Sequence, residues 1–110
     1  MPNYIQSQMP DVLPSVMQIG VLQVQVLLPG VRSLKEKRGI IKGILQRIQN
    51  RFQVATAEVG HQDVWDLAGF GFAAVGTDVA FLQSRLQKVV NFIESSGLVE
   101  VLDFHVDILS

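Results

Sequence analysis

The chain has 110 residues, of which 48% are hydrophobic and 17% are charged, and its formal net charge is −1. This length suits a single domain, and this composition excludes disordered, collagen-like and low-complexity chains. The sequence contains no cysteine, which excludes disulfides, thiolate zinc sites and thiol nucleophiles.

Three prolines fall within residues 1–16, where they disfavour helices and strand ladders. We therefore predict a mobile tail over 1–16 and a single domain over 17–110. No apolar run approaches the roughly 20 residues that a membrane span needs. Arg32 is the first basic residue, so the N-terminus lacks the charged start of a secretory signal. We expect a cytoplasmic protein that does not bind membranes.

A strand and a helix come next. Residues 19–28 alternate between apolar and polar side chains, which predicts a half-buried strand. Ser33 followed by Glu36 is typical of a capping box at the start of a helix. The apolar stripe of this helix consists of Leu34, Ile41, Leu45, Ile48 and Phe52. Lys37 falls inside the apolar arc, where we expect its stem to pack while its ammonium reaches water.

Three more strands and a second helix complete the pattern. The strands are predicted over 53–59, 67–75 and 98–109, and a hairpin connection between the first two begins at Gly60. Thr77 or Asp78 caps the second helix, and Gly97 suits a left-handed stop after it. In the last strand, Asp103, His105 and Asp107 share one face.

This order of elements (strand, helix, strand, strand, helix, strand) predicts an α+β ferredoxin-like sandwich. Two split strand–helix–strand units with right-handed crossovers place four antiparallel strands in the order 4-1-3-2. Both helices are then expected on one face of the sheet.

Three stretches are distinctive when taken together. They are RSLKEKR at residues 32–38, then Ala57-Glu58-Val59 followed by His61, Gln62, Asp63 and Trp65, and finally residues 99–102. In order and spacing they resemble the YlxP-like family, a bacterial domain of unknown function, over residues 18–109. The resemblance implies a ferredoxin-like fold and no established activity. Because members are often encoded among translation and ribosome-maturation genes, it also implies an RNA-related role.

The family's characteristic positions fall here on Ser33, Leu34, Lys35, Glu36, Lys37, Arg38, Glu58, His61, Gln62, Asp63 and Trp65. The chain departs from the family at Gly60, where members usually have an acid. It departs again at Asp66-Leu67, where a more basic pair is common. Both departures concern the loop and leave its role open.

Positive charge is concentrated in one segment. Residues 32–51 hold seven bases and one acid, a net charge of +6, whereas residues 52–110 hold two bases and eight acids, a net charge of −6. A cationic helix suits the phosphates of structured RNA. The predicted RNA-binding or partner-binding residues are Arg32, Lys35, Lys37, Arg38 and Lys42. The alternative is a solvated helix whose cations pair with acids on neighbouring loops.

Residues 69–75 (GFGFAAV) resemble the RNP1 motif of RRM domains and fall on the third strand, where that motif belongs. However, Ala68 stands where a base should precede the motif, and the first strand has no aromatic residue. The acids that we expect on the open sheet face, where they would repel phosphate, are Glu58, Asp103 and Asp107. We therefore expect Phe70 and Phe72 to be core side chains.

Glu58, His61 and Asp63 offer two carboxylates and an imidazole for metal binding or acid–base chemistry. No paired-His, HExxH or calcium-loop spacing accompanies them. The simpler expectation is that Asp63 caps the turn and Trp65 folds over the end of the sheet. The sequence shows no Walker A loop, dinucleotide fingerprint or nucleophile elbow. We predict no enzymatic activity and no metal, cofactor or small-molecule ligand.

The first hypothesis is therefore an accessory domain that binds RNA or a ribosomal particle through its basic helix. The alternative is a protein-interaction module or homo-oligomer. The small residues on the outer face of the helix and the two exposed edge strands (second and fourth) favour that alternative.

Overall fold

The structure, a computed structural model, describes residues 16–109. Its elements are β1 (Gln18–Leu27), α2 (Leu34–Phe52), β2 (Ala55–Gly60), β3 (Leu67–Gly76), α3 (Val79–Ser95) and β4 (Glu100–Leu109). The predicted order of strands and helices is confirmed. The tail predicted over 1–16 lies outside the described residues, apart from Val16.

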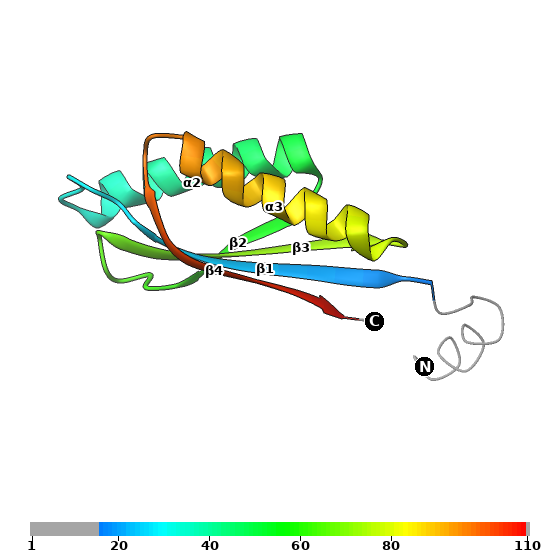
Figure 1. Cartoon of the computed structure of the whole chain (residues 1–110). Helices are drawn as coiled ribbons and strands as arrows, with labels where there is room; N and C mark the ends of the chain where they lie inside the picture. The colour runs from blue at the N-terminus through cyan, green and yellow to red at the C-terminus, as the bar shows by residue number, and fades with distance from the viewer. Residues whose placement is uncertain (1–15, 110) are drawn as a thin grey trace, which may run out of the picture.

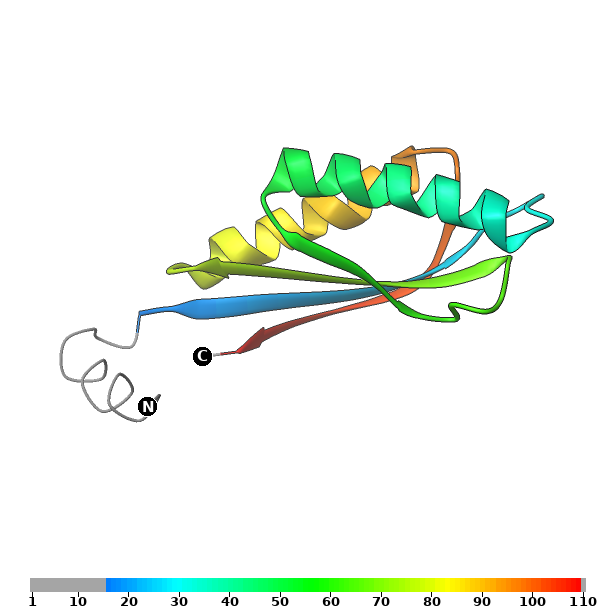
Figure 2. The ribbon, with the colours of Figure 1, turned by 180° about the vertical axis from the view of Figure 1, so that it is seen from behind.

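The four strands form one antiparallel sheet in the order β2-β3-β1-β4, which is the predicted order read from the other edge. Both helices cover one face of this sheet and leave the other face bare (Figure 1). Seen from behind, α2 runs along the β2 side, while α3 packs over β1 and β4 (Figure 2). The sheet has two edges, the six-residue β2 and the ten-residue β4.

Both helices begin at the residues that the sequence indicates. The Ser33 hydroxyl accepts a hydrogen bond from the N–H of Glu36 at 3.1 Å, and the Asp78 carboxylate accepts one from the N–H of Phe81 at 3.0 Å. These caps satisfy donors that have no partner within the helix. Gly97 follows α3 with φ +73°, a left-handed conformation that suits glycine. Neither helix of the described part of the chain is long and apolar enough to cross a membrane.

The hydrophobic core lies between the helices and the sheet. Its side chains include Ile41, Ile44 and Ile48 of α2, Leu82, Leu86, Val89, Val90 and Ile93 of α3, and Leu22, Val24 and Val26 of β1. Phe70 and Phe72 are buried among them, as predicted, with ring centroids 6.2 Å apart in an edge-to-face arrangement. Neither ring is therefore available for stacking on the bare face of the sheet.

Replacing Phe70 by alanine is expected to lower the free energy of unfolding by about 3–5 kcal/mol, because the ring is fully buried and its removal leaves a cavity. Phe81 provides the matched control. It is 74% exposed on the first turn of α3, so its replacement by alanine should change stability by less than about 0.5 kcal/mol. Urea unfolding followed by circular dichroism measures both. Equal losses would contradict this packing of β3 under the helices.

Candidate functional site

One flank of α2 carries exposed cations. Lys35, Arg38 and Lys42 are exposed, and their spacing of three and four residues places them on one side of the helix. Arg51 marks the other flank, because its guanidinium carbon lies 5.5 Å from the ring centroid of Phe52 and 5.7 Å from that of Phe92 on α3. The cationic flank, which we define as Lys35, Arg38 and Lys42, therefore faces away from α3.

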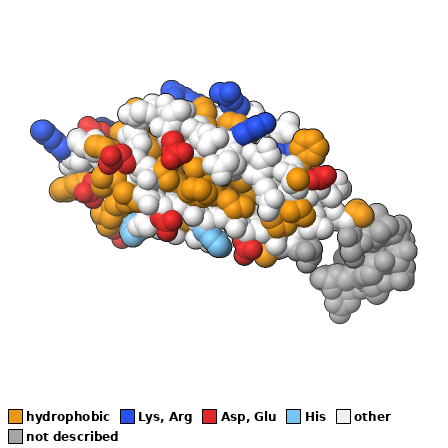
Figure 3. All heavy atoms as spheres, in the orientation of Figure 1, with side chains coloured by type: hydrophobic (Ala, Val, Ile, Leu, Met, Phe, Trp, Pro, Cys, Tyr) orange, Lys and Arg blue, Asp and Glu red, His pale blue; other side chains and the backbone are white. Residues whose placement is uncertain are grey.

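No acid within the described part of the chain neutralises the cationic flank. Between residues 16 and 109, the one ion pair within 4.0 Å joins Lys37 and Glu58. Glu36 instead accepts a hydrogen bond from the backbone N–H of Arg32 at 3.2 Å. The alternative was that acids on neighbouring loops pair with these cations. Within residues 16–109, Lys35, Arg38 and Lys42 form no such pairs. Lys and Arg lie mainly on the helical side of the molecule, whereas both histidines and several acids lie lower on the visible surface (Figure 3).

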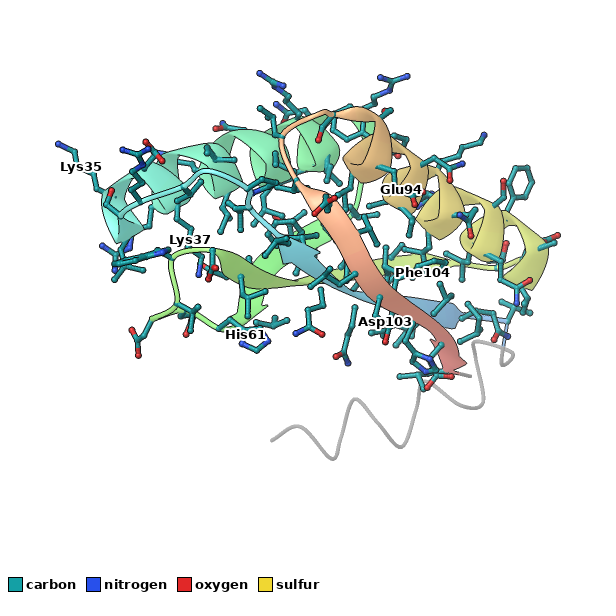
Figure 4. The ribbon with its side chains drawn as sticks, turned by 60° about the vertical axis from the view of Figure 1, so that its left-hand side comes forward. Lys35, Lys37, His61, Glu94, Asp103 and Phe104 are labelled. Carbon is teal, nitrogen blue, oxygen red and sulfur yellow. The ribbon has the colours of Figure 1, made fainter. Side chains whose placement is uncertain are left out.

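Lys37 differs from its neighbours because it is buried. Its side chain is 1% exposed, and its ammonium donates to the carbonyl of His61 at 2.5 Å and to that of Val64 at 2.6 Å. The same nitrogen lies 3.1 Å from Glu58 Oε2. Lys37 points from α2 toward the sheet, whereas Lys35 points away from it (Figure 4). The prediction that the Lys37 ammonium reaches water is therefore wrong, and this residue is not available to bind RNA.

Glu58 lies under α2 and not on the bare face of the sheet. It stands opposite Phe70 in the β2–β3 ladder and so shares the face of that buried ring. Its Oε2 is buried and has no aligned hydrogen bond, so the contact with Lys37 is a close ion pair without hydrogen-bond geometry. The prediction that Glu58 lies on the open face is wrong, because a buried ammonium requires an opposite charge within reach.

The loop over 61–66 is tied to α2 through Lys37. His61 has a left-handed backbone, with φ +57°, and its carbonyl accepts hydrogen bonds both from Lys37 and from the N–H of Val64. Its ring Nε2 lies 2.8 Å from the amide nitrogen of Gln25 on β1. The side chain of Gln62 donates to the Glu58 carbonyl at 3.4 Å. These contacts fix the loop against both the helix and the sheet.

One expectation about this loop is corrected. The turn is closed by the Val64 N–H and the Gln62 amide, whereas we expected the Asp63 carboxylate to cap it. Trp65 is 53% exposed, so about half of its surface is open to solvent. Since Lys37 binds the carbonyl of Val64, the exposed indole lies at the same end of the molecule as the first turn of α2.

The bare face of the sheet contains a shallow cavity of about 260 Å³ that the sequence analysis missed. Its polar lining consists of Gln23, Gln25, His61, Asp103 and His105. Alternating polar residues on β1 and β4 were the available signal, but the register that brings them together is not readable from either strand alone. Among residues 16–109, no group of three His, Asp or Glu side chains is placed to hold a metal ion.

The chain is similar to known proteins over most of its length. Residues 19–106 match the family described as "Protein of unknown function (DUF503)". A relative from Bacillus subtilis (strain 168), "Uncharacterized protein YlxP", is 40% identical over 82 residues, which cover 74% of this chain and 89% of that protein. Among solved structures, "De novo designed protein Foldit4" superposes with a TM-score of 0.48 at 12% identity, covering 86% of this chain and 97% of that chain. The residues matched by the family include α2 and the loop over 61–66.

Replacing Lys37 by methionine is expected to lower the free energy of unfolding by roughly 2–4 kcal/mol, because two carbonyls and the Glu58 carboxylate lose their partner. Lys35→Met is the matched control. Lys35 is exposed two residues earlier, so its loss should cost less than about 0.5 kcal/mol. Urea unfolding gives both values. We also expect faster amide exchange in the loop over 61–66 of Lys37→Met alone, and equal stability of the two variants would refute the buried site.

Proposed function

We propose that this chain, which belongs to the DUF503 family of proteins of unknown function, is a non-enzymatic accessory domain that binds structured cytoplasmic RNA, free or in a ribosomal particle, through the exposed side of α2. One observation carries the proposal. Arg32, Lys35, Arg38 and Lys42 are all exposed and have no ion-pair partner among residues 16–109, although eight acids follow them in the sequence. Phosphates are the natural partners for such a set of cations.

The shape of α2 suits an RNA backbone. Lys35 and Lys42 are seven residues apart, which corresponds to about 10 Å along the helix axis, with Arg38 between them. Gly39 and Gly43 lie beside them, and nothing stands within 4 Å of the position that a Cβ would occupy at either glycine. The helix backbone is thus open to close approach next to the cationic flank. Double-stranded RNA is recognised largely through shape and backbone contacts of this kind.

The Trp65 indole adds a second mode of contact at the same end of the protein. It is exposed beside the start of α2, and the loop that carries it is held by Lys37. Exposed aromatic rings stack on unpaired bases with little sequence preference. An RNA hairpin offers both kinds of feature, because its stem presents phosphates and its loop presents unpaired bases.

The bare face of the sheet is a poorer candidate for RNA. The RRM mode needs aromatic rings on that face, and Phe70 and Phe72 are buried on the other side. Asp103 and Asp107 are exposed on β4 and would repel phosphate. The proposal therefore places RNA on the helical side alone.

Lys42→Glu is expected to weaken binding of a labelled RNA hairpin at least about fivefold at low salt, because a phosphate contact becomes a repulsion. The slope of log affinity against log salt should also become shallower by about 0.7–0.9. Fluorescence anisotropy over a salt series measures both.

Lys88→Glu is the matched control for this experiment, since Lys88 is an exposed lysine on α3 and the change in net charge is the same. Less than about a twofold loss is expected, because the effect of a distant surface charge is screened. Equal losses in the two variants would show that only net charge matters. If the unmodified protein binds neither the hairpin nor purified ribosomal subunits, the proposal is wrong.

Trp65 is the only tryptophan of the chain, so its fluorescence reports contact at this end of the molecule. Titration with the unlabelled hairpin is expected to quench its emission, because bases that stack on the indole alter its surroundings. Lys42→Glu should shift the quenching curve to higher RNA concentration. Full RNA binding without any change in emission would place the RNA elsewhere.

A further inference from the structure

Strand β4 is a long, open edge of the sheet. It runs from Glu100 to Leu109 and pairs on one side only, with β1. Unpaired strand edges of this length are ready templates for another strand, and proteins ordinarily shorten, bend or cover them. The opposite edge, β2, is only six residues long.

The backbone of Phe104 shows which amides face outward. Its N–H donates to the carboxylate of the preceding Asp103 at 2.9 Å, so it is not engaged with β1. Successive residues of an antiparallel strand direct their N–H groups to opposite sides. The amides of Val106 and Ile108 therefore face the open edge as well, and β4 presents a row of donors and acceptors to a further strand.

Apolar side chains accompany this edge on its helical side. Phe104 is 41% exposed and Leu102 is 52% exposed, and Leu102 has no partner on β1 because the register shifts there. Val106 and Ile108 are partly buried against the core on the same side of the sheet. A second strand placed along β4 would cover the two exposed side chains.

Charge on the bare side of β4 restricts which strand fits. Asp103, His105 and Asp107 alternate there, so an antiparallel copy centred on His105 would oppose Asp103 to Asp107 of its partner, and like charges directly opposite destabilise a sheet. A copy centred on Phe104 instead places His105 opposite Asp103 twice, once on each side of the axis. In that dimer, the Asp103 carboxylate gives up its hydrogen bond from the N–H of its own Phe104 and accepts one from the His105 imidazole of the other chain.

The register centred on Phe104 also brings together two apolar side chains that are exposed on this edge, Phe104 and Leu102. It sets the two Phe104 rings opposite each other and brings Leu102, which lies at the register shift of β4, toward Val106 of the other copy. The register centred on Val106 pairs residues 103–109 and sets His105 opposite Asp107, but it leaves Leu102 uncovered. Aromatic and aliphatic cross-strand pairs each contribute roughly 0.2–1 kcal/mol.

We infer that β4 is a homodimer edge: a second copy of this chain adds to it as an antiparallel strand, with the two-fold axis at Phe104 and His105 facing Asp103 of the other copy. The result is a continuous eight-stranded sheet with all four helices on one side. This inference is independent of RNA binding, because α2 lies toward the β2 side and stays exposed in both copies.

The chain has no cysteine, so single-cysteine variants can read the register directly. Opposed residues in a hydrogen-bonded antiparallel pair have Cα atoms about 5.5 Å apart, within disulfide range. Phe104→Cys is therefore expected to form a disulfide-linked dimer under mild oxidation. His105→Cys and Val106→Cys are the controls, because in this register each stands about 8 Å or more from its own copy and does not cross-link. Cross-linking of either control in preference to Phe104→Cys would overturn the register.

Analytical ultracentrifugation of the unmodified protein tests the dimer without any substitution. A monomer at every concentration would overturn the inference, whatever the result of the RNA experiments. His105→Asp is expected to weaken the dimer at least about tenfold, because two carboxylates then face each other in each pair. Adding Asp103→Lys to that variant should restore dimerisation, since each pair then joins a carboxylate and an ammonium. Failure of this rescue would mean that His105 and Asp103 do not face each other across the axis.

Discussion

Burying the Lys37 ammonium requires that its charge and its N–H donors be satisfied by protein, because water does not reach it. The carbonyls of His61 and Val64 provide acceptors, and Glu58 provides the opposite charge. Because these partners come from β2 and the following loop, they fix how α2 is rotated about its axis. The same contacts hold the loop in place and turn Glu58 inward.

The rotation of α2 determines which cations remain outside. At 3.6 residues per turn, Lys35 lies about 160° around the helix from Lys37 and Lys42 about 140°, so both must point away from the core. One basic segment thus supplies a structural lysine and a set of free cations. Because the cationic flank and the β4 edge lie toward opposite edges of the sheet, a dimer through β4 would carry two such flanks. Two linked contacts to one RNA bind more tightly than either alone.

Local patterns were sufficient to predict most of the fold. Caps at Ser33 and Asp78 and the periodicity of strands and helices depend on residues close in sequence, and the structure contains all of them. The partnership of Lys37 and Glu58 depends on how α2 packs against β2, which no local pattern contains. In a half-buried strand, the apolar side chains usually face the core and the polar ones face solvent, and strand β2 does the opposite. Its apolar side chains, Ala55, Ala57 and Val59, face outward, while Glu58 faces the helix.

Hydrogen exchange at the lysine ammonium groups tests the account most directly, by nitrogen-15 NMR on protein labelled at lysine Nζ. We expect the Lys37 ammonium to give a distinct, slowly exchanging signal, because it is buried and donates to two carbonyls. Lys35, Lys42 and Lys88 should exchange rapidly with water, as exposed groups do. If Lys37 exchanges as fast as those three, its ammonium is not held inside the fold, and the division of the basic segment into one structural lysine and a free cationic flank is wrong.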